Sequence, residues 1–194
     1  IPDEASENTW EGIATINNSW GFKSYDEDWK SPAETLFWLL ENVSKGGNFL
    51  LNVGPDGTGV IPKQSADNLL AVGRWLKVNG DAIYGTKPWK ITHEGPAGIS
   101  IKGTEHRSKH GFKLDVTSED FWFTKKSMKL YVIGMVWPES GIARVRSLND
   151  VSFTEVRLLG SPEKLHWKKE SGTVEIQLPK TELEKLGYAL EITL

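Results

Sequence analysis

A short apolar segment between two helical patterns constrains the fold more than any other stretch of this chain. Residues 48–53 (Asn-Phe-Leu-Leu-Asn-Val) are mainly apolar and show no clear alternation. Such a run is typical of a strand buried on both faces, as in a parallel sheet covered by helices. Gly46-Gly47 precedes it and Gly54-Pro55-Asp56-Gly57 follows it, and both are turn signals.

The flanking patterns predict a helix on each side of this strand. Ser31-Pro32 supplies a cap and a first-turn proline before apolar residues that recur at helical spacing up to Val43. Pro62 begins a second such pattern, which Asn79-Gly80 ends. Helix, buried strand and helix form the repeating unit of an α/β sheet or barrel, where ligands meet the carboxyl ends of the strands. We therefore expect residues 52–59 to face a binding site.

The second half of the chain has a different character. Helical periods disappear after Trp89, and short alternating runs separated by turn signals replace them. These runs cover residues 89–93, 98–102, 121–124, 129–137, 143–147, 152–159, 165–168, 173–178 and 189–194. Many short, evenly spaced strands are typical of an antiparallel sandwich. The fold class is therefore α/β plus all-β, with an α/β portion at 1–87 and a β-sandwich at 88–194.

Composition excludes several classes of protein. The 194 residues are 38% hydrophobic and 25% charged, which is typical of a soluble globular protein. A net charge of -3 with interspersed signs gives no sign of a nucleic-acid surface, and no apolar run is long enough to cross a membrane. Without cysteine there is no disulfide framework. Nine tryptophans suit either a sugar-binding cleft or a core, and we expect Trp20, Phe22, Trp38 and Trp75 in the core.

The α/β portion is too small to stand alone. A parallel sheet needs several strands with both faces covered, and residues 1–87 offer one buried strand and one or two more before it. We therefore expect this portion to complete a larger sheet whose other strands lie on a preceding segment or a separate chain. The first residue is Ile1, without an initiator Met or a signal peptide, which is compatible with a cut or processed piece.

An ordered series of motifs carries a resemblance to a known family. It runs through Trp10-Glu11, Asn17-Asn18-Ser19-Trp20-Gly21-Phe22, Asp28-Trp29-Lys30-Ser31, Gly46-Gly47-Asn48-Phe49-Leu50-Leu51-Asn52-Val53-Gly54-Pro55, Gly73-Arg74-Trp75-Leu76 and Asn79-Gly80-Asp81-Ala82-Ile83-Tyr84-Gly85. The series closely resembles the α-L-fucosidases of glycoside hydrolase family 29. The match is dense over residues 10–89 and weaker as far as Trp167.

The resemblance implies a fold and a chemistry. These enzymes have a distorted (β/α)8-like barrel followed by a C-terminal β-sandwich, so residues 1–87 would be the end of the barrel. They release terminal α-L-fucose from oligosaccharides and glycoconjugates with retention, using an aspartate nucleophile and a carboxyl acid/base. Retention requires these two carboxyl groups to be about 5–5.5 Å apart. The aspartate lies before the matched part, so an N-terminal barrel segment or chain is the expected partner.

From the residues themselves we expect no cofactor, no metal, no nucleic-acid partner and no membrane partner. The resemblance indicates a secreted, periplasmic or lysosomal-type compartment, and homo-oligomerisation stays open. The alternative function is a non-catalytic carbohydrate-binding or structural piece of such an enzyme.

Three residues are the site candidates. Glu11 matches the family's Trp-Glu position and is the predicted general acid/base, since neighbouring apolar groups raise the pKa of a carboxyl; the alternative is a surface glutamate. Trp29, on a loop at the expected rim, would bury the apolar face and methyl group of fucose. The equally weighted alternative for Trp29 is packing on the helix that follows. Trp10 is the third candidate, as a substrate-binding residue.

Overall fold

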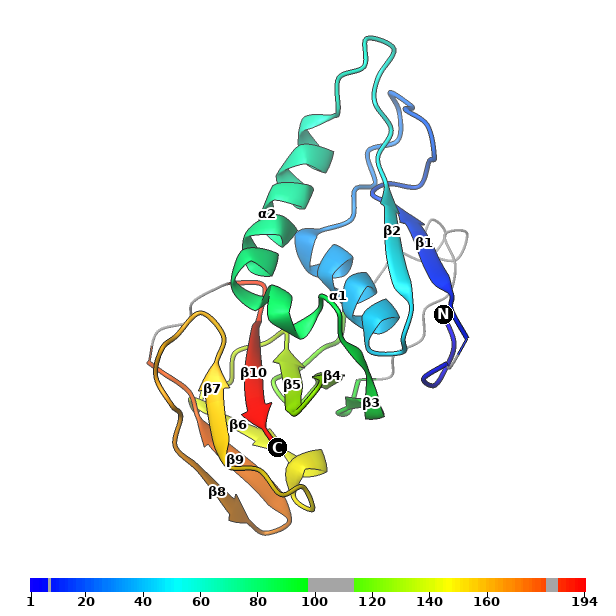
Figure 1. Cartoon of the computed structure of the whole chain (residues 1–194). Coiled ribbons are helices and arrows are strands. Elements are labelled where there is room, and N and C mark those ends of the chain that lie inside the picture. Colours follow the sequence, from blue (N-terminus) through cyan, green and yellow to red (C-terminus); the bar gives the residue numbers. More distant parts are fainter. Residues whose placement is uncertain (7, 98–113, 181–184) are drawn as a thin grey trace.

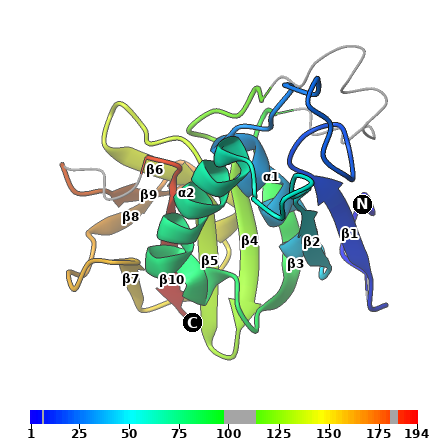
Figure 2. The same ribbon diagram turned by 90° about the horizontal axis from the view of Figure 1, so that it is seen from above.

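The computed structural model describes residues 1–6, 8–97, 114–180 and 185–194. Its elements form successive layers, with the strand pair β1–β2 and the helices α1 and α2 above a two-sheet C-terminal half (Figure 1). Seen from above, the helices cover one sheet of that half, and β1 lies at the far side of the molecule (Figure 2). The strand expected at 98–102 lies outside the described residues.

The first half contains the predicted helix–strand–helix unit, preceded by one more strand. β1 (Glu11–Thr15) pairs in parallel with β2 (Asn48–Asn52), and α1 (Pro32–Val43) connects them. Ser31 caps α1 by accepting a hydrogen bond from the Glu34 N–H at 3.0 Å, as the sequence predicted. α2 (Lys63–Asn79) follows, beginning after Pro62 and ending at Gly80. The predicted α/β unit is therefore confirmed.

Gly12 allows β1 to lie close against α1. A Cβ atom at this position would lie 1.8 Å from the Asn42 Oδ1 atom, which is far inside van der Waals contact. Asn42 is itself fixed, because its amide donates to the Trp38 carbonyl at 2.7 Å. A residue without a side chain is therefore required where this strand meets the helix.

The second half is an antiparallel β-sandwich, as predicted. One sheet has the order β3-β4-β5-β10-β7, and the other has the order β6-β9-β8. The strands are β3 (Lys87–Glu94), β4 (Phe121–Lys126), β5 (Lys129–Gly134), β6 (Ile142–Val145), β7 (Glu155–Leu158), β8 (Trp167–Glu170), β9 (Thr173–Gln177) and β10 (Tyr188–Thr193). Two short 3-10 helices, η1 (Gly80–Ala82) and η2 (Arg146–Leu148), lie in the connections. A division at 87/88 stays a prediction.

Two hydrophobic clusters cover both faces of the five-stranded sheet. Between the sheets lie Phe121, Phe123, Val132, Val174, Ile176 and Leu190 with their neighbours. On the other face, Trp122 and Ile133 pack with Leu36 and Leu40 of α1 and Trp75 of α2. Strands β4 and β5 therefore have almost no exposed residues in their central parts, and the helices and the sandwich share one continuous interface.

Polar contacts reinforce that interface. The Trp75 indole N–H donates to the Gly187 carbonyl at 3.0 Å, and the Asn79 side chain accepts from the Ala189 N–H at 3.1 Å. Glu41 of α1 accepts from the Trp122 indole at 2.6 Å and pairs with Lys45 at 2.8 Å. Because Glu41 is almost fully buried, its contacts with Trp122 and Lys45 are shielded from water.

One face of the β1–β2 pair is uncovered, and here the structure departs from the predictions. Ile13 and Leu50 are opposite each other on it and are 52% and 42% exposed. The strand expected to be buried on both faces thus has one exposed face, and Phe49 and Leu51 on its other face are half-buried. Trp20 and Phe22, predicted in the core, are 62% and 45% exposed because they lie on the loop beyond the end of β1. Trp75 is fully buried as predicted, whereas Trp38 is half-buried. None of the described helices combines the length and apolarity of a membrane span.

Candidate functional site

The loops that follow β1 and β2 are joined to each other beyond the carboxyl ends of these strands. The Asn52 amide donates to the Trp20 carbonyl at 2.7 Å. Gly54 lies so close to the other loop that a Cβ atom there would be 2.9 Å from the Phe22 backbone nitrogen. The two loops therefore form one connected rim, at the edge where parallel α/β sheets meet their ligands.

Carboxylates in this rim are held by their neighbours. The Ser19 hydroxyl donates to Asp26 at 2.5 Å, and the Asn18 amide donates to Asp28 at 2.7 Å. Sequence reasoning did not select these acids. The available signal was an acidic run, 26–28, in the loop between β1 and α1, and such a run is more often a solvated surface.

Asp56 has a different role in the second loop. Its carboxylate accepts from the Thr58 hydroxyl at 2.6 Å and from the Thr58 and Val60 backbone N–H groups. These hydrogen bonds, led by the Thr58 hydroxyl, lower the pKa of Asp56. A carboxylate stabilised in this way closes a turn and is a poor proton donor.

Trp29 lies on the rim, half-buried. Its position is fixed by the next residue, since the Lys30 N–H donates to the Ile16 carbonyl at 2.7 Å and the Lys30 carbonyl accepts from the Asn68 amide at 2.7 Å. Trp29 is thus at the carboxyl end of β1, where a sugar-contacting residue would be expected. Sugar contact and packing on α1 both stay predictions.

Glu11 and Trp10 lie at the opposite end of β1. Glu11 is the first residue of the strand, is exposed, and pairs with Asn48 at the start of β2. The Trp10 indole N–H donates to the Lys45 carbonyl at 3.3 Å, and its ring occupies the space where a Cβ of Gly47 would lie, 2.5 Å away. Trp10 therefore fastens the turn that precedes β2.

The separation of these candidates limits what they can do together. At about 3.3 Å per residue, the Cα atoms of Glu11 and Thr15 are roughly 13 Å apart, and Trp29 lies beyond Thr15. A retaining glycosidase needs its carboxyl groups about 5–5.5 Å apart around one bond. Glu11 and Trp29 therefore lie toward opposite ends of β1. The acid/base role of Glu11 stays a prediction.

Two hollows lie away from the rim. One of about 1070 Å³ is at the amino end of β2, lined by Asn8, Asn48, Phe49 and Tyr84 among others. Another of about 750 Å³ is on the sandwich, between β8, β9 and the turn before β6. Within the described ranges, histidines and acids do not gather into a group of three or more that could hold a metal ion.

Comparison with known proteins identifies the family. The sequence profile "Alpha-L-fucosidase" matches residues 1–81, and the profile "Alpha-L-fucosidase C-terminal domain" matches residues 114–194. This chain belongs to the α-L-fucosidase family. It is 33% identical to the human tissue alpha-L-fucosidase over 172 residues, which are 87% of this chain and 32% of that protein. The mouse tissue alpha-L-fucosidase is 31% identical over 201 residues, covering 99% and 40%.

Solved structures of the family have the same fold. An alpha-L-fucosidase superimposes with a TM-score of 0.82 at 30% identity, covering 100% of this chain and 40% of that one. The alpha-fucosidase of Thermotoga maritima in complex with fucose superimposes with a TM-score of 0.79 at 30% identity, covering 97% and 41%. This chain thus spans between about a third and two fifths of the length of the fucosidases it matches.

Proposed function

We propose that this chain is part of a retaining exo-glycosidase that releases terminal α-L-fucose from oligosaccharides and glycoconjugates. The observation that carries the proposal is the parallel β1–β2 pair, which has helices on one face and exposed Ile13 and Leu50 on the other. In a barrel, side chains on the face away from the helices fill the interior. A pair of strands open on that face suits the last two strands of a (β/α)8-like barrel.

The catalytic centre is then shared with other polypeptide. The double-displacement mechanism needs a carboxylate that attacks the anomeric carbon and a second carboxyl group that protonates the leaving oxygen. The nucleophilic aspartate is on a barrel segment or chain outside residues 1–194. This chain supplies the rim that follows β1 and β2 and carries Trp29.

Trp29 is proposed to contact the sugar. A half-buried indole presents a rigid apolar surface, and fucose has an apolar C6 methyl group and a C–H face that such a surface can desolvate. The neighbouring Asp26 and Asp28, which Ser19 and Asn18 orient, lie in the same loop. They are the carboxyl groups to be tested beside Glu11 for proton transfer.

The test is hydrolysis of 4-nitrophenyl α-L-fucoside by the intact protein, with the anomer formed first identified by NMR. Initial release of α-L-fucose is expected. Trp29→Ala should lower kcat/KM by roughly 10–100-fold, in line with about 1–3 kcal/mol for a lost apolar contact in a substrate pocket. Absence of hydrolysis, or β-L-fucose as the first product, would overturn the proposal.

Variants of the carboxyl groups decide which residue transfers the proton. If Glu11 is the acid/base, as the family resemblance predicts, Glu11→Gln should lose most of the turnover and azide should restore it. Undiminished turnover, or a loss that azide does not restore, would remove Glu11 from this role. The same measurement on Asp28→Asn and Asp26→Asn tests the rim.

A further inference from the structure

The hollow on the β-sandwich has the construction of a ligand site. It measures about 750 Å³, within the range of small-molecule pockets, and its lining includes Trp137, His166, Trp167, Lys168, Glu175 and Gln177. From this geometry we propose that the hollow is a second carbohydrate site, which binds a neutral oligosaccharide remote from the fucose-releasing centre. The choice of a saccharide rests on the proposed function, whereas the site itself rests on the residues below.

Two tryptophans provide rigid aromatic surface. Trp137 packs edge-on against buried Tyr188, with ring centroids 5.1 Å apart, and Trp167 packs against buried Phe153 at 4.3 Å. Both indoles are only half-buried, although each is fixed by the core on one side. Rings held in this way lose little conformational entropy on binding, and the C–H faces of sugars stack on such surfaces.

Hydrogen-bonding groups also line the hollow. In the register of β8 with β9, Lys168 is opposite Glu175, and the exposed Gln177 follows on the same face of β9. Trp167 is opposite the buried Ile176 and therefore meets the hollow from the core side of this sheet. The amide of Gln177 offers both a donor and an acceptor, and Glu175 offers acceptors. Hydroxyl groups of a sugar need this mixture of donors and acceptors around an apolar face.

The charges favour a neutral ligand over an anion. Lys168 pairs with Glu170 and, at 3.3 Å, with Glu175, which also accepts from Arg144 at 2.9 Å. The hydrogen bond from Arg144, with that from Lys168, lowers the pKa of Glu175, so this carboxylate stays charged at neutral pH. Because Lys168 and Arg144 are already paired, a sulfate or phosphate would gain little attraction from them.

The walls of the hollow are tied together by backbone hydrogen bonds. The Gln177 N–H donates to the His166 carbonyl at 2.9 Å, and the Leu178 N–H donates to the Gly141 carbonyl at 2.9 Å. Gly141 closes the turn after Pro138. Its φ angle is +68°, a value that glycine adopts without strain. The site is thus formed before any ligand arrives, which lowers the cost of binding.

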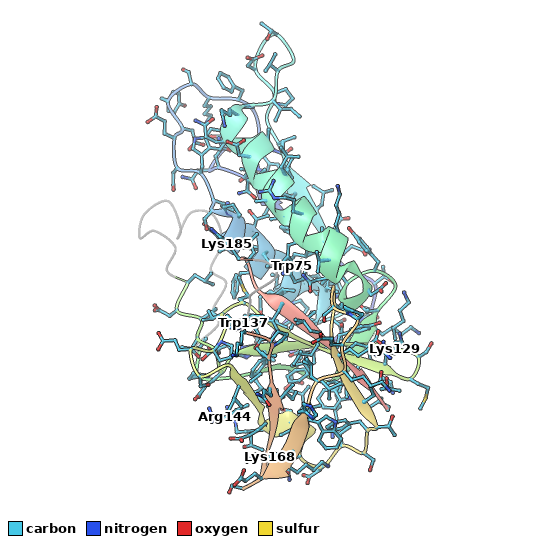
Figure 3. The ribbon with its side chains drawn as sticks, turned by 90° about the vertical axis from the view of Figure 1, so that its left-hand side faces the viewer. Trp75, Lys129, Trp137, Arg144, Lys168 and Lys185 are labelled. Atoms are coloured by element: carbon cyan, nitrogen blue, oxygen red, sulfur yellow. The ribbon has the colours of Figure 1, made fainter. Side chains whose placement is uncertain are left out.

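Its place in the molecule separates it from the catalytic rim. The sheet β6-β9-β8 lies on the opposite side of the molecule from β1 in both views (Figures 1 and 2). Figure 3 faces this side, with Trp137 above Arg144 and Lys168. A barrel completed on the uncovered face of β1–β2 would leave the hollow open. A glycan chain held here would raise the local concentration of its other branches at the rim.

The test uses a saccharide without fucose, so that it is independent of catalysis. Lacto-N-tetraose is titrated into the intact protein and followed by the indole N–H signals in NMR spectra and by calorimetry. We expect saturable binding with a Kd of roughly 0.1–1 mM, which corresponds to about -5.5 to -4 kcal/mol. The variant His166→Ala/Gln177→Ala, in which both altered side chains are exposed, should weaken binding at least tenfold. Gln64→Ala on α2 is the matched control and should bind like the parent.

Several outcomes would overturn the proposal. They are no saturation by about 10 mM tetrasaccharide, equal binding by the double variant, or tenfold tighter binding of a sulfated analogue. Failure of this site and failure of the fucosidase proposal are distinguishable. Binding that depends on Gln177 without fucoside hydrolysis supports the hollow alone, and hydrolysis without such binding supports the fucosidase alone.

Discussion

Removal of the Glu41 carboxylate should destabilise the junction between the helices and the sandwich more than any surface change. Glu41 is 1% exposed, receives the Trp122 indole N–H at 2.6 Å and pairs with Lys45 at 2.8 Å. Glu41→Ala leaves both partners buried, and the Lys45 side chain is only 11% exposed. Breaking a buried pair by removing one partner typically costs about 3–5 kcal/mol, because the remaining charge is uncompensated.

The assay is urea unfolding of the intact protein, followed by tryptophan fluorescence. With an m value of about 3 kcal/mol/M, a loss of about 3–5 kcal/mol lowers the unfolding midpoint by roughly 1–1.7 M. Lys45→Met combined with Glu41→Ala should cost less than Glu41→Ala alone plus Lys45→Met alone, since no unpaired charge remains. Such non-additivity is the signature of a direct interaction.

A matched control lies on the surface of α2. Lys63 and Asp67 have the same four-residue spacing, but their side chains are 82% and 59% exposed. Because water screens this pair, Lys63→Ala should move the midpoint only slightly. A midpoint shift for Glu41→Ala as small as that of Lys63→Ala would refute the reasoning, since it would mean that water reaches the pair.

Three further predictions concern other parts of the chain. Gly47→Ala should cost about 1–3 kcal/mol in the same unfolding assay, because its Cβ would lie 2.5 Å from the Trp10 ring; wild-type stability would contradict the packing described. Trp29→Ala should impair fucoside turnover while leaving the unfolding midpoint nearly unchanged, and an equal loss of both would indicate packing on α1 instead. Burial lowers the pKa of His93 below 6.5, against the opposing effects of Asp120 and Glu41. Neutral His93 thus contributes stability above pH 6.5 that is lost as the pH falls, and His93→Gln should unfold with a weaker dependence on pH between 7 and 5.

The local elements were predictable because their signals are local. Ser31-Pro32 and Asn79-Gly80 mark helix ends through hydrogen bonds and backbone angles within a few residues, and both ends are where the sequence placed them. The alternating strands within the described residues were found for the same reason. Their extents were overestimated where apolar residues continue into turns, as at Trp137, which follows the end of β5 at Gly134.

The environment of the loops was not predictable, since it depends on contacts distant in sequence. Trp20 and Phe22 were assigned to the core because they flank a glycine in a tight segment. The glycine and its neighbours instead pack against Gly54 of the other loop and leave both rings exposed. Similarly, the motif that contains Glu11 indicates a family, but it does not indicate at which end of a strand Glu11 lies. Only the pairing with Asn48 shows that it starts β1.

The contacts that hold α2 have a consequence for how the protein is made. Trp75 bonds to Gly187, and Asn79 bonds to Ala189, so this helix is secured by residues more than a hundred positions later in the chain. During translation, the helix leaves the ribosome long before β10 has been synthesised. The apolar face of the helix therefore stays exposed to solvent until β10 has been made. A nascent chain that stalled before Tyr188 would expose this face to chaperones and proteases.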